Sequence, residues 1–473
     1  MTSNTPNHSP PNAALGHWLP RNRSHIREWL GRKLTELEEI KNSPLHPTIS
    51  ALKDLVEDNP TLATLAKDMF IQIPPSYIND PTGVPQVKDF DKMLDLVNLI
   101  IQQGPQWFER DDHSAMGLIG FPINAILDWP IGTLAGYAFF TMFPDVNAKW
   151  RDILATWGEF LKSDASQQCL NEKTGWLSKD ALVFLTFKGN DGTTKYTFTE
   201  LYQCNPSQPY FGFASWDLFF TRSFNKGIRP VSFPDDKPID SPEDGPNLLP
   251  GDQIQTFQQI TSPNQVIVNA CESTPLQYAT NVKLHDTFWL KRQPYSLANM
   301  LNNDPRATEF VGGSVYQAFL SALSYHQWHA PVSGTVLSTE VVAGTYYSEN
   351  LYQGFFADNP NPDPAAANNS QPYISSVATR GIIFIEADNV DIGLIAIVFI
   401  GMAEVSSCEF TVKPNDCITK GQPIGMFHFG GSSHCVLYRP STASRLRFLV
   451  SPPWKPDANS NNAVNSALAV VAA

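Results

Sequence analysis

The sequence predicts an α+β fold in which a helical N-terminal region packs on a mainly antiparallel β core. Apolar residues recur at helical spacing in several segments between residue 22 and about residue 185, residues 90–103 being the clearest. Beyond residue 206 the chain consists of short strand-like runs separated by glycine- and proline-rich turns. Hydrophobic residues make up 42% of the chain and charged residues 17%, which is typical of a globular protein with a substantial core.

The composition along the chain predicts four parts. Residues 1–20 are polar and proline-rich and predict a disordered tail, and residues 21–205 predict a helical domain. Residues 206–451 predict a β-rich domain, and the low-complexity residues 452–473 predict a flexible C-terminal tail. Residues 352–372, rich in Asn, Pro, Asp and Ala, predict a long loop inside the β-rich domain.

Individual elements follow from the apolar pattern. Helices are expected at residues 24–40, 49–56, 62–71, 90–103 and 146–161, and a short one at 296–301. Residues 116–143 are largely apolar, but Pro122, Asn124, Asp128 and Pro130 interrupt them, so a buried helix or helix pair is expected. The wholly apolar residues 392–402 predict a buried central strand, since a membrane-spanning helix needs about 20 residues. Further strands are expected at 265–270, 287–290, 381–386 and 409–412.

Charge and cysteine usage limit the classes of function. The net charge of -13 argues against a nucleic-acid binder and against adsorption to an anionic membrane. The six cysteines form no C-x-x-C pair, and the polar N-terminus has no apolar signal-peptide core, so reduced cysteines and a cytoplasmic location are expected.

Two glycines meet two serines after an apolar run, at Gly430-Gly431-Ser432-Ser433. The residues alone allow two interpretations. One is a flexible turn between strands, because Gly and Ser are common turn residues. The other is self-cleavage, in which the Ser432 hydroxyl attacks the carbonyl of Gly431 with the help of a neighbouring base.

Other residues could carry chemistry. His326 and His329 would share one face if their segment were helical. Metal ligation would need a third ligand that no nearby cluster supplies, which leaves core histidines or acid–base catalysis as the interpretations. No metal site is therefore expected. Glu404 follows the apolar strand, where an acid must be paired or functional, whereas Glu272 alone would be an ordinary solvated acid.

Two hairpin-like segments, 330–336 and 418–425, are similar to those of the small barrel-sandwich domains that carry biotin or lipoate. The lysine in a Met-Lys-Met-like setting that a carrier needs is absent. The scaffold can be shared while the function is not.

The order of several motifs is specific. It comprises FFTR at 219–222, KG-x-RP at 226–230, YSL at 295–297, YH-x-x-H-x-P at 325–331 and F-x-F-G-G-S-S at 427–433. With these motifs the chain resembles the phosphatidylserine decarboxylase family, and more narrowly a fungal branch of soluble, pyruvoyl-dependent aromatic amino-acid decarboxylases. The resemblance runs from about residue 20 to 450 and implies that family's fold.

The resemblance implies self-cleavage between Gly431 and Ser432, with Ser432 converted to a covalent pyruvoyl cofactor. The products would be a β chain of residues 1–431 and an associated α chain of residues 432–473. His329 would be the base for cleavage and His326 would act in decarboxylation through a Schiff base with the substrate amine. The family's acid lies in a P-A-D-G motif, where this chain has Ala270-Cys271-Glu272-Ser273, so Glu272 would substitute, with Asp286 a weaker candidate.

The residues before the second histidine bear on the substrate. Phospholipid-cleaving relatives carry R-L-A-P-x-D-Y-H-R there, whereas this chain reads FLSALSYHQ at 319–327, without the arginines and the aspartate. Since a phosphodiester ligand favours arginine, this loss and the net charge of -13 point to a small soluble substrate. The resemblance implies an aromatic amino acid, L-tryptophan first, with tryptamine and CO2 as products. The alternatives are a phosphatidylserine decarboxylase making phosphatidylethanolamine at a membrane, and an inactive scaffold protein. Candidate substrate-binding residues are Glu404, His434, Phe427, Phe429 and Tyr347.

Overall fold

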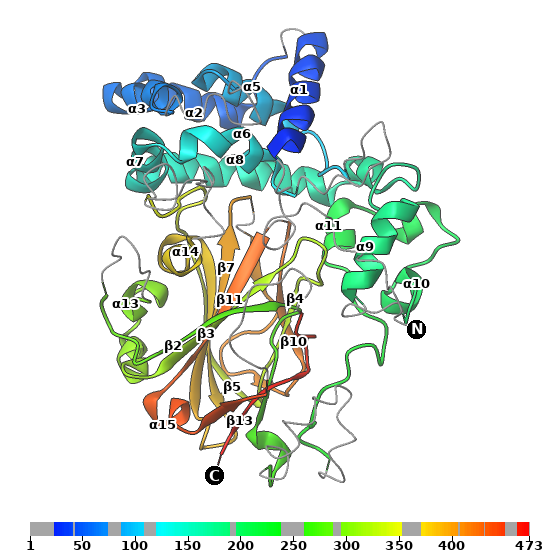
Figure 1. Cartoon of the computed structure of the whole chain (residues 1–473), viewed down its shortest axis with the longest axis vertical. Coiled ribbons are helices and arrows are strands. Elements are labelled where there is room, and N and C mark those ends of the chain that lie inside the picture. The colour runs from blue at the N-terminus through cyan, green and yellow to red at the C-terminus, as the bar shows by residue number, and fades with distance from the viewer. Residues whose placement is uncertain are drawn as a thin grey trace, which may run out of the picture.

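The helices of the N-terminal half form two stacked layers above one end of the β-sheets (Figure 1). The structure is a computed structural model of the 473-residue chain. It describes residues 23–40, 43–73, 87–107, 120–189, 195–237, 260–286, 295–351, 370–404, 407–429, 431–449 and 461–472. The predicted tail 1–20, the predicted strand 287–290 and residues 352–369 of the predicted loop lie outside these ranges.

Seven longer helices build the two layers. Those of the outer layer are α1 (Arg23–Ile40), α2 (Pro47–Glu57), α3 (Pro60–Ile71) and α5 (Phe90–Ile100); those nearer the sheets are α6 (Pro122–Ile131), α7 (Leu134–Met142) and α8 (Pro144–Lys162). Residues at the helix starts favour these positions. Proline occupies the first turn of α2, α3, α6 and α8, where its missing N–H costs no hydrogen bond. Asn59 and Asp89 accept hydrogen bonds from the first backbone N–H groups of α3 and α5. The predicted helices are confirmed, and residues 116–143 contain the expected helix pair.

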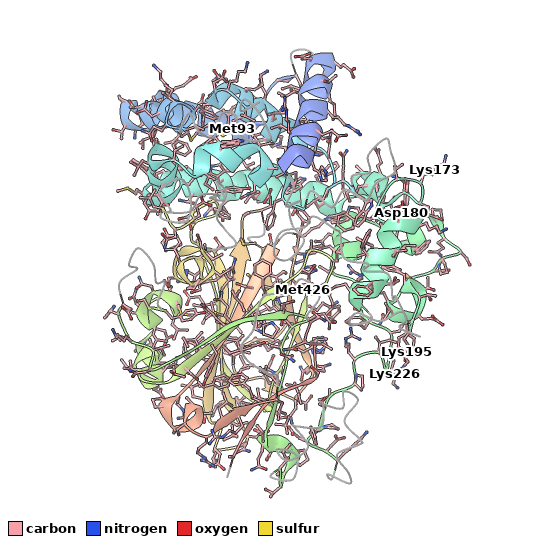
Figure 2. The ribbon with its side chains drawn as sticks, viewed as in Figure 1. Met93, Lys173, Asp180, Lys195, Lys226 and Met426 are labelled. Atoms are coloured by element: carbon pink, nitrogen blue, oxygen red, sulfur yellow. The ribbon has the colours of Figure 1, made fainter. Side chains whose placement is uncertain are left out.

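A second group of short helices lies beside the sheets (Figure 1). It contains η2 (Asp164–Leu170), α9 (Lys179–Gly189), α10 (Phe198–Leu201), η3 (Pro209–Gly212) and α11 (Trp216–Phe220). Figure 2 shows Lys173, Asp180, Lys195 and Lys226 along this edge of the molecule, whereas Met93 lies in the helical layers. Backbone hydrogen bonds from Gln203 to Ser223 and from Asn225 to Leu201 cross the expected boundary at residues 205–206. The segment on either side of that boundary is therefore closely packed.

Within the described residues, the β core consists of three antiparallel sheets. The largest has the strand order β2-β3-β11-β7-β6-β5-β9. Its strands are β2 (Thr274–Thr280), β3 (Ser314–Leu320), β11 (Gly431–Tyr438), β7 (Leu394–Met402), β6 (Arg380–Ala387), β5 (Gly334–Val342) and β9 (Cys417–Ile418). A small sheet has the order β4 (Gln327–His329), β10 (Pro423–Phe427) and β8 (Cys408–Phe410), and the third has β1 (Val266–Val268), β13 (Ala467–Val471) and β12 (Leu446–Phe448). The predicted α+β class is confirmed.

The remaining short helices lie around the β core. They are η6 (Pro263–Gln265), α13 (Leu297–Met300), η7 (Pro305–Phe310), α14 (Gln371–Val377) and α15 (Pro440–Ala443).

Aromatic packing joins the small sheet to the large one. Every residue of β7 is buried, as the apolar run predicted for a central strand. The Trp328 ring of β4 stacks on the Phe399 ring of β7, with centroids 3.8 Å apart and planes 4° from parallel. Phe427 of β10 meets Trp328 edge-on at 4.7 Å. The small sheet therefore covers the large sheet close to its central strands.

The predicted flexible tail needs correction for residues 461–472. Strand β13 is fully buried and pairs with β1 on one side and β12 on the other. The Asn-, Ser- and Ala-rich composition suggested a loose segment, but the apolar residues 467–471 fill a strand position between two partners.

Candidate functional site

The Gly431–Ser432 bond lies at the beginning of a central strand. Ser432 is opposite Leu320 of β3 and Gly401 of β7, and Gly431 is opposite Met402. The backbone on the C-terminal side of this bond is therefore fixed by strands on both sides. The side chain of Ser432 lies outside what the structure describes.

His326 and His329 do not share a helix face, because residues 327–329 form strand β4. The His326 ring is buried and stacks on Phe220 of α11, with centroids 3.9 Å apart. Burial lowers the pKa of His326 well below its usual range, and the nearby positive charge of Arg222 lowers it further. His326 is therefore a neutral imidazole in an aromatic setting.

His329 has a defined tautomer. Its Nδ1 lies 2.8 Å from the carbonyl oxygen of Gly421, which can only accept, so Nδ1 carries the proton. Its Nε2 lies 2.9 Å from the Tyr325 hydroxyl and accepts a hydrogen bond from it, and the same hydroxyl lies 3.1 Å from Gln327 Oε1. Burial lowers the pKa of His329 to about 4. Near neutral pH the ring is uncharged and Nε2 is the nitrogen able to take up a proton.

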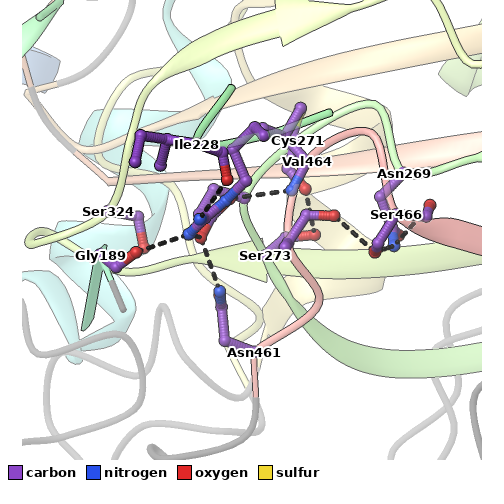
Figure 3. A network of polar contacts seen from close by, with 12 residues as sticks. Gly189, Ile228, Asn269, Cys271, Ser273, Ser324, Asn461, Val464 and Ser466 are labelled. Carbon is purple, nitrogen blue, oxygen red and sulfur yellow. Dashed lines mark hydrogen bonds and ion pairs between the residues drawn. The ribbon is translucent and has the colours of Figure 1, made fainter. Parts of the chain in front are cut away.

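Glu272 is not the solvated acid that its sequence context alone suggested, but a buried one whose described partners do not include His329. Figure 3 shows two of its partners, Asn461 and Val464. Its carboxylate accepts from Arg229 Nε at 3.0 Å and Nη2 at 2.6 Å, from Asn461 Nδ2 at 2.9 Å and from the Val464 N–H at 2.8 Å. His329 Nδ1 instead donates its orienting hydrogen bond to the Gly421 carbonyl, while the negative charge of Glu272 acts to raise the pKa of His329. Asp286 pairs with Lys283.

The FFTR motif holds the segment that precedes the two histidines. Arg222 is buried and donates to the carbonyl groups of Phe219, Leu323 and Ser324. Gln327 Nε2 donates to the Thr221 carbonyl at 2.7 Å. The motif therefore holds the histidine segment in two ways. The Arg222 side chain binds backbone carbonyls of the segment, and the Thr221 carbonyl accepts from a side chain of the segment. The motif order indicated that Arg222 mattered, but not what it binds.

Glu404 is a buried carboxyl group near the end of β7. Its Oε1 accepts from the Asn124 N–H at 2.8 Å and so caps α6, whose preceding residue Phe121 provides no capping side chain. Its Oε2 has no hydrogen-bond partner within the described residues. Burial raises the pKa of Glu404 to about 8. The group is therefore largely protonated near neutral pH.

A small cavity lies between α6, the end of β7 and residues 346–349. It has room for about one water molecule, roughly 10 Å³ for the centre of a water-sized sphere. Its lining includes Asn124, Tyr347, Ser348, Glu349, Gly401 and Met402. Gly401 and Met402 are also the partners of Ser432 and Gly431 in the sheet, so the cavity borders the strand that pairs with the Gly–Ser bond. A much larger cavity of about 1,030 Å³ between α1 and η2 is lined by no residue of β3, β7, β10 or β11.

The predicted substrate-binding aromatics fall into separate clusters. Phe427 packs on Trp328 and Phe399, and Phe429 packs on Trp157, Trp216 and Phe220. Phe429 thereby joins the aromatic group that contains the His326 ring. Tyr347 packs on Trp150 and borders the small cavity. Its hydroxyl has no hydrogen-bond partner among the described residues.

His434 is buried in β11, opposite Phe399. Neither ring nitrogen has a hydrogen-bond partner in the described part of the chain, and burial lowers the pKa of His434 to about 3. The neighbouring Ser433 hydroxyl, by contrast, accepts from Gln317 Nε2 at 3.2 Å, and Gln317 Oε1 accepts from the Tyr295 hydroxyl at 2.6 Å. Tyr295 and Ser433 belong to the YSL and F-x-F-G-G-S-S motifs, but the motifs did not predict that Gln317 joins them in a buried polar chain.

The described ranges contain no group of three His, Cys, Asp or Glu side chains placed to hold a metal ion. None of their helices is long and apolar enough to cross a bilayer.

Comparison with known sequences agrees with the motif order. Two family profiles, both described as phosphatidylserine decarboxylase, match residues 46–185 and 254–458. A protein named decarboxylase iboD from Amanita muscaria is 38% identical over 357 residues, which cover 73% of this chain and 92% of that protein. An L-tryptophan decarboxylase from Psilocybe cubensis is 32% identical over 441 residues, covering 91% of this chain and 89% of the relative.

At lower identity, the chain is also similar to proteins named phosphatidylserine decarboxylase proenzyme. A phosphatidylserine decarboxylase proenzyme from Clostridium perfringens is 26% identical over 230 residues, which cover 49% of this chain and 63% of the relative. Given the two family profiles and the long matches to named decarboxylases, the chain belongs to the phosphatidylserine decarboxylase family and is a decarboxylase.

Proposed function

We propose that the chain is the precursor of a pyruvoyl-dependent aromatic L-amino-acid decarboxylase, which cuts itself between Gly431 and Ser432 and converts L-tryptophan to tryptamine and CO2. The observation that carries the proposal is the register of β11, in which the two residues of this bond lie between β3 and β7 and pair with Met402 and Gly401, two lining residues of the small cavity. The relatives named proenzymes support processing, and those named L-tryptophan decarboxylase support the substrate.

Self-cleavage would begin with attack of the Ser432 hydroxyl on the Gly431 carbonyl carbon, which converts the amide to an ester. Loss of the Ser432 α-proton then breaks the Cβ–Oγ bond, releases the Gly431 carboxylate and leaves dehydroalanine at the new N-terminus. Water adds and ammonia leaves, so that a pyruvoyl group remains on the nitrogen of Ser433. The β chain of residues 1–431 and the α chain of residues 432–473 stay associated through the sheets.

His329 is the proposed base for this cleavage. Its neutral ring, its fixed tautomer and its accepting Nε2 suit a group that takes up the serine proton. Glu272 is proposed to support the base indirectly, by its charge and by fixing the segment that contains Val464.

The surroundings of residue 432 fit a small uncharged group. Gly401, its partner in β7, has no side chain and lines the small cavity together with Tyr347. The buried Glu404 Oε2 and Tyr347 hydroxyl have unused hydrogen-bonding capacity among the described residues. When present, a pyruvoyl group supplies a carbonyl electron sink for the loss of CO2 from an amino acid. Glu404 and Tyr347 are the residues proposed to hold it or the substrate amine or indole N–H.

The other predicted residues have proposed roles around the substrate. His326 would lie near the leaving carboxylate, where the N–H of its neutral imidazole can donate a hydrogen bond. To donate a proton it would first have to take one up as the reaction proceeds, which its lowered pKa opposes. Phe429 contacts the aromatic group around His326, and Phe427 and His434 lie deeper in the core. A cytoplasmic location remains part of the proposal.

A second candidate is a phosphatidylserine decarboxylase, which the profile descriptions favour. Purified full-length protein incubated with L-tryptophan and, separately, with phosphatidylserine vesicles distinguishes the two. We expect tryptamine from the first incubation, and phosphatidylethanolamine alone from the second would contradict the proposed substrate.

Denaturing electrophoresis and mass spectrometry test the processing. We expect two fragments, with a pyruvoyl group rather than serine at the start of the smaller one, and a single uncut band for Ser432→Ala. An uncut wild-type chain without turnover would favour the inactive scaffold.

A further inference from the structure

The C-terminal segment 461–466 is anchored beside the histidine proposed as the base. Glu272 holds Asn461 and the backbone of Val464, and the Asn462 N–H donates to the Ser273 carbonyl at 2.7 Å. At the other end of the segment, the Asn269 N–H donates to the Ser466 carbonyl at 2.8 Å, and the Asn269 side chain donates to the Ser466 hydroxyl at 2.9 Å (Figure 3). These bonds fix Asn465, which lies between them.

Asn465 has a defined backbone and side-chain orientation. Its φ of 67° lies in the left-handed region that asparagine tolerates better than most residues. Its N–H donates to the Asn269 carbonyl at 3.0 Å and its carbonyl accepts from the Ser232 N–H at 2.9 Å. Its Nδ2 donates to the Arg229 carbonyl at 3.1 Å, which decides which way the carboxamide faces.

The remaining atom, Asn465 Oδ1, is a buried acceptor with no hydrogen-bond partner in the described part of the chain. It lies 3.4 Å from the position that a Cβ would take on Gly421. The carbonyl of Gly421 is the group that accepts the proton of His329 Nδ1. The Asn465 side chain also acts to raise the pKa of His329, as an acceptor close to the ring does.

We propose that Asn465 is a positioning residue for His329, whose carboxamide oxygen shares the Nδ1 proton with the Gly421 carbonyl when the ring takes up a second proton during self-cleavage. It would fill the place that a carboxylate holds in a Ser-His-Asp arrangement. The inference rests on the proposed function of His329. It adds that the base lies on the N-terminal side of the cleaved bond while its positioning residue lies on the C-terminal side.

A neutral acceptor has a chemical consequence. The ionisable groups around the ring are the Tyr325 hydroxyl at Nε2 and the Glu272 carboxylate, which Arg229 neutralises. Lys420, next to Gly421, pairs with Asp235 at 2.7 Å. No unpaired carboxylate therefore touches the ring in this part of the described chain, and a carboxylate placed at position 465 would change its protonation.

The test compares Asn465→Asp with Asn465→Gly in the full chain, following the rate of self-cleavage between pH 4 and 8. A carboxylate near a histidine raises its pKa by about 1 to 3 units, so Asn465→Asp should move the acid limb of the cleavage profile upward by about that amount. Asn465→Gly keeps the left-handed backbone and should slow cleavage roughly 10-fold to 100-fold at all pH values. Asn415→Asp, an exposed residue with a φ of 72°, is the matched control and should leave the profile unchanged.

A second measurement separates this inference from the proposed function. In the uncut Ser432→Ala chain, the pKa of His329 can be followed by NMR of labelled histidine, and Asn465→Asp should raise it while Asn415→Asp should not. An unchanged His329 pKa and an unmoved cleavage profile in folded Asn465→Asp protein would overturn the positioning role. An uncut wild-type chain in which Asn465→Asp nevertheless raises the pKa would overturn the proposed function alone.

Discussion

Arg229 and Glu272 form a bidentate ion pair in which the carboxylate is almost completely buried, 1% of its side chain being exposed. Arg229 also donates to the Gly189 carbonyl at 2.7 Å, so the pair links α9, the start of β2 and the C-terminal segment. A salt bridge of this kind is costly to break because the remaining charge stays buried.

We therefore predict that Glu272→Ala and Arg229→Ala each lower the free energy of unfolding by about 3 to 5 kcal/mol. Urea denaturation of the uncut Ser432→Ala chain measures this without interference from cleavage. The double variant Arg229→Ala/Glu272→Ala should lose clearly less than the sum of the two single losses, since no charge remains unpaired. A loss in the double variant equal to the sum of the two single losses would show that the residues act independently.

Two glycines with positive φ angles provide a matched pair. At Gly421, with a φ of 82°, a Cβ would lie 2.2 Å from Val231 Cγ2, whereas at Gly227, with a φ of 88°, it would meet nothing within 4 Å. Both alanine variants bear the cost of the left-handed backbone, about 1 kcal/mol. Only Gly421→Ala should also displace the carbonyl that holds His329 and slow self-cleavage. Equal cleavage rates in the two variants would show that this carbonyl does not position the base.

The two histidines should separate processing from turnover. We predict that His329→Ala stays uncut, because the proposed base is lost, while His326→Ala is cut but decarboxylates slowly. Electrophoresis measures the first property and tryptamine release the second. General acid–base catalysis typically contributes about 100-fold to 10,000-fold, which sets the size of the expected losses. If the two variants are cleaved to the same extent and release tryptamine at the same rate, neither histidine has its proposed role.

We expect the Glu404 carboxyl group to lower the free energy of unfolding as pH rises and yet to be needed for decarboxylation. Its folded pKa of about 8 lies above its ordinary value of 4.5, so the folded protein binds more protons and loses stability as pH rises from 4.5 to 8. Glu404→Gln keeps the capping oxygen for α6, and at pH 8 it should raise the free energy of unfolding by an amount on the order of 3 kcal/mol. The same variant should lose decarboxylation, whereas Glu386→Gln, at an exposed site, serves as the control. Unchanged turnover of L-tryptophan in Glu404→Gln would assign Glu404 to capping alone.

His434 should make the protein sensitive to acid. Its folded pKa of about 3 lies below the ordinary 6.5, so the unfolded chain binds more protons and stability falls as pH drops from 6.5 towards 3. At pH 5 this amounts to about 2 kcal/mol. His434→Gln should therefore show a smaller loss of stability between pH 7 and pH 5 than the parent chain. Parallel losses in the two proteins would place the acid sensitivity elsewhere.

Local patterns predicted the elements that depend on nearby residues. The helices expected at residues 62–71 and 146–161 and the central strand expected at 392–402 follow from the apolar pattern, and all three are confirmed. The motif order led to the family, which the profile matches confirm.

What the sequence could not predict depends on contacts between distant residues. The spacing of His326 and His329 suggests one helix face, but β4 is only three residues long and its strand character comes from pairing with β10. Glu272 finds Arg229 and Val464 at separations of 43 and 192 residues, and no local pattern encodes such a choice. Residues 467–471 became a strand for the same reason, because two other strands flank them.

The central position of β11 affects how the mature protein would recover from denaturation. A precursor refolds within one chain, whereas the proposed cut leaves β11 and β13 on a separate fragment that must be recaptured from solution. Refolding would then be a second-order reaction whose yield depends on protein concentration. Once unfolded at low concentration the enzyme would not regain its sheet, and its useful lifetime would be set by its rate of unfolding.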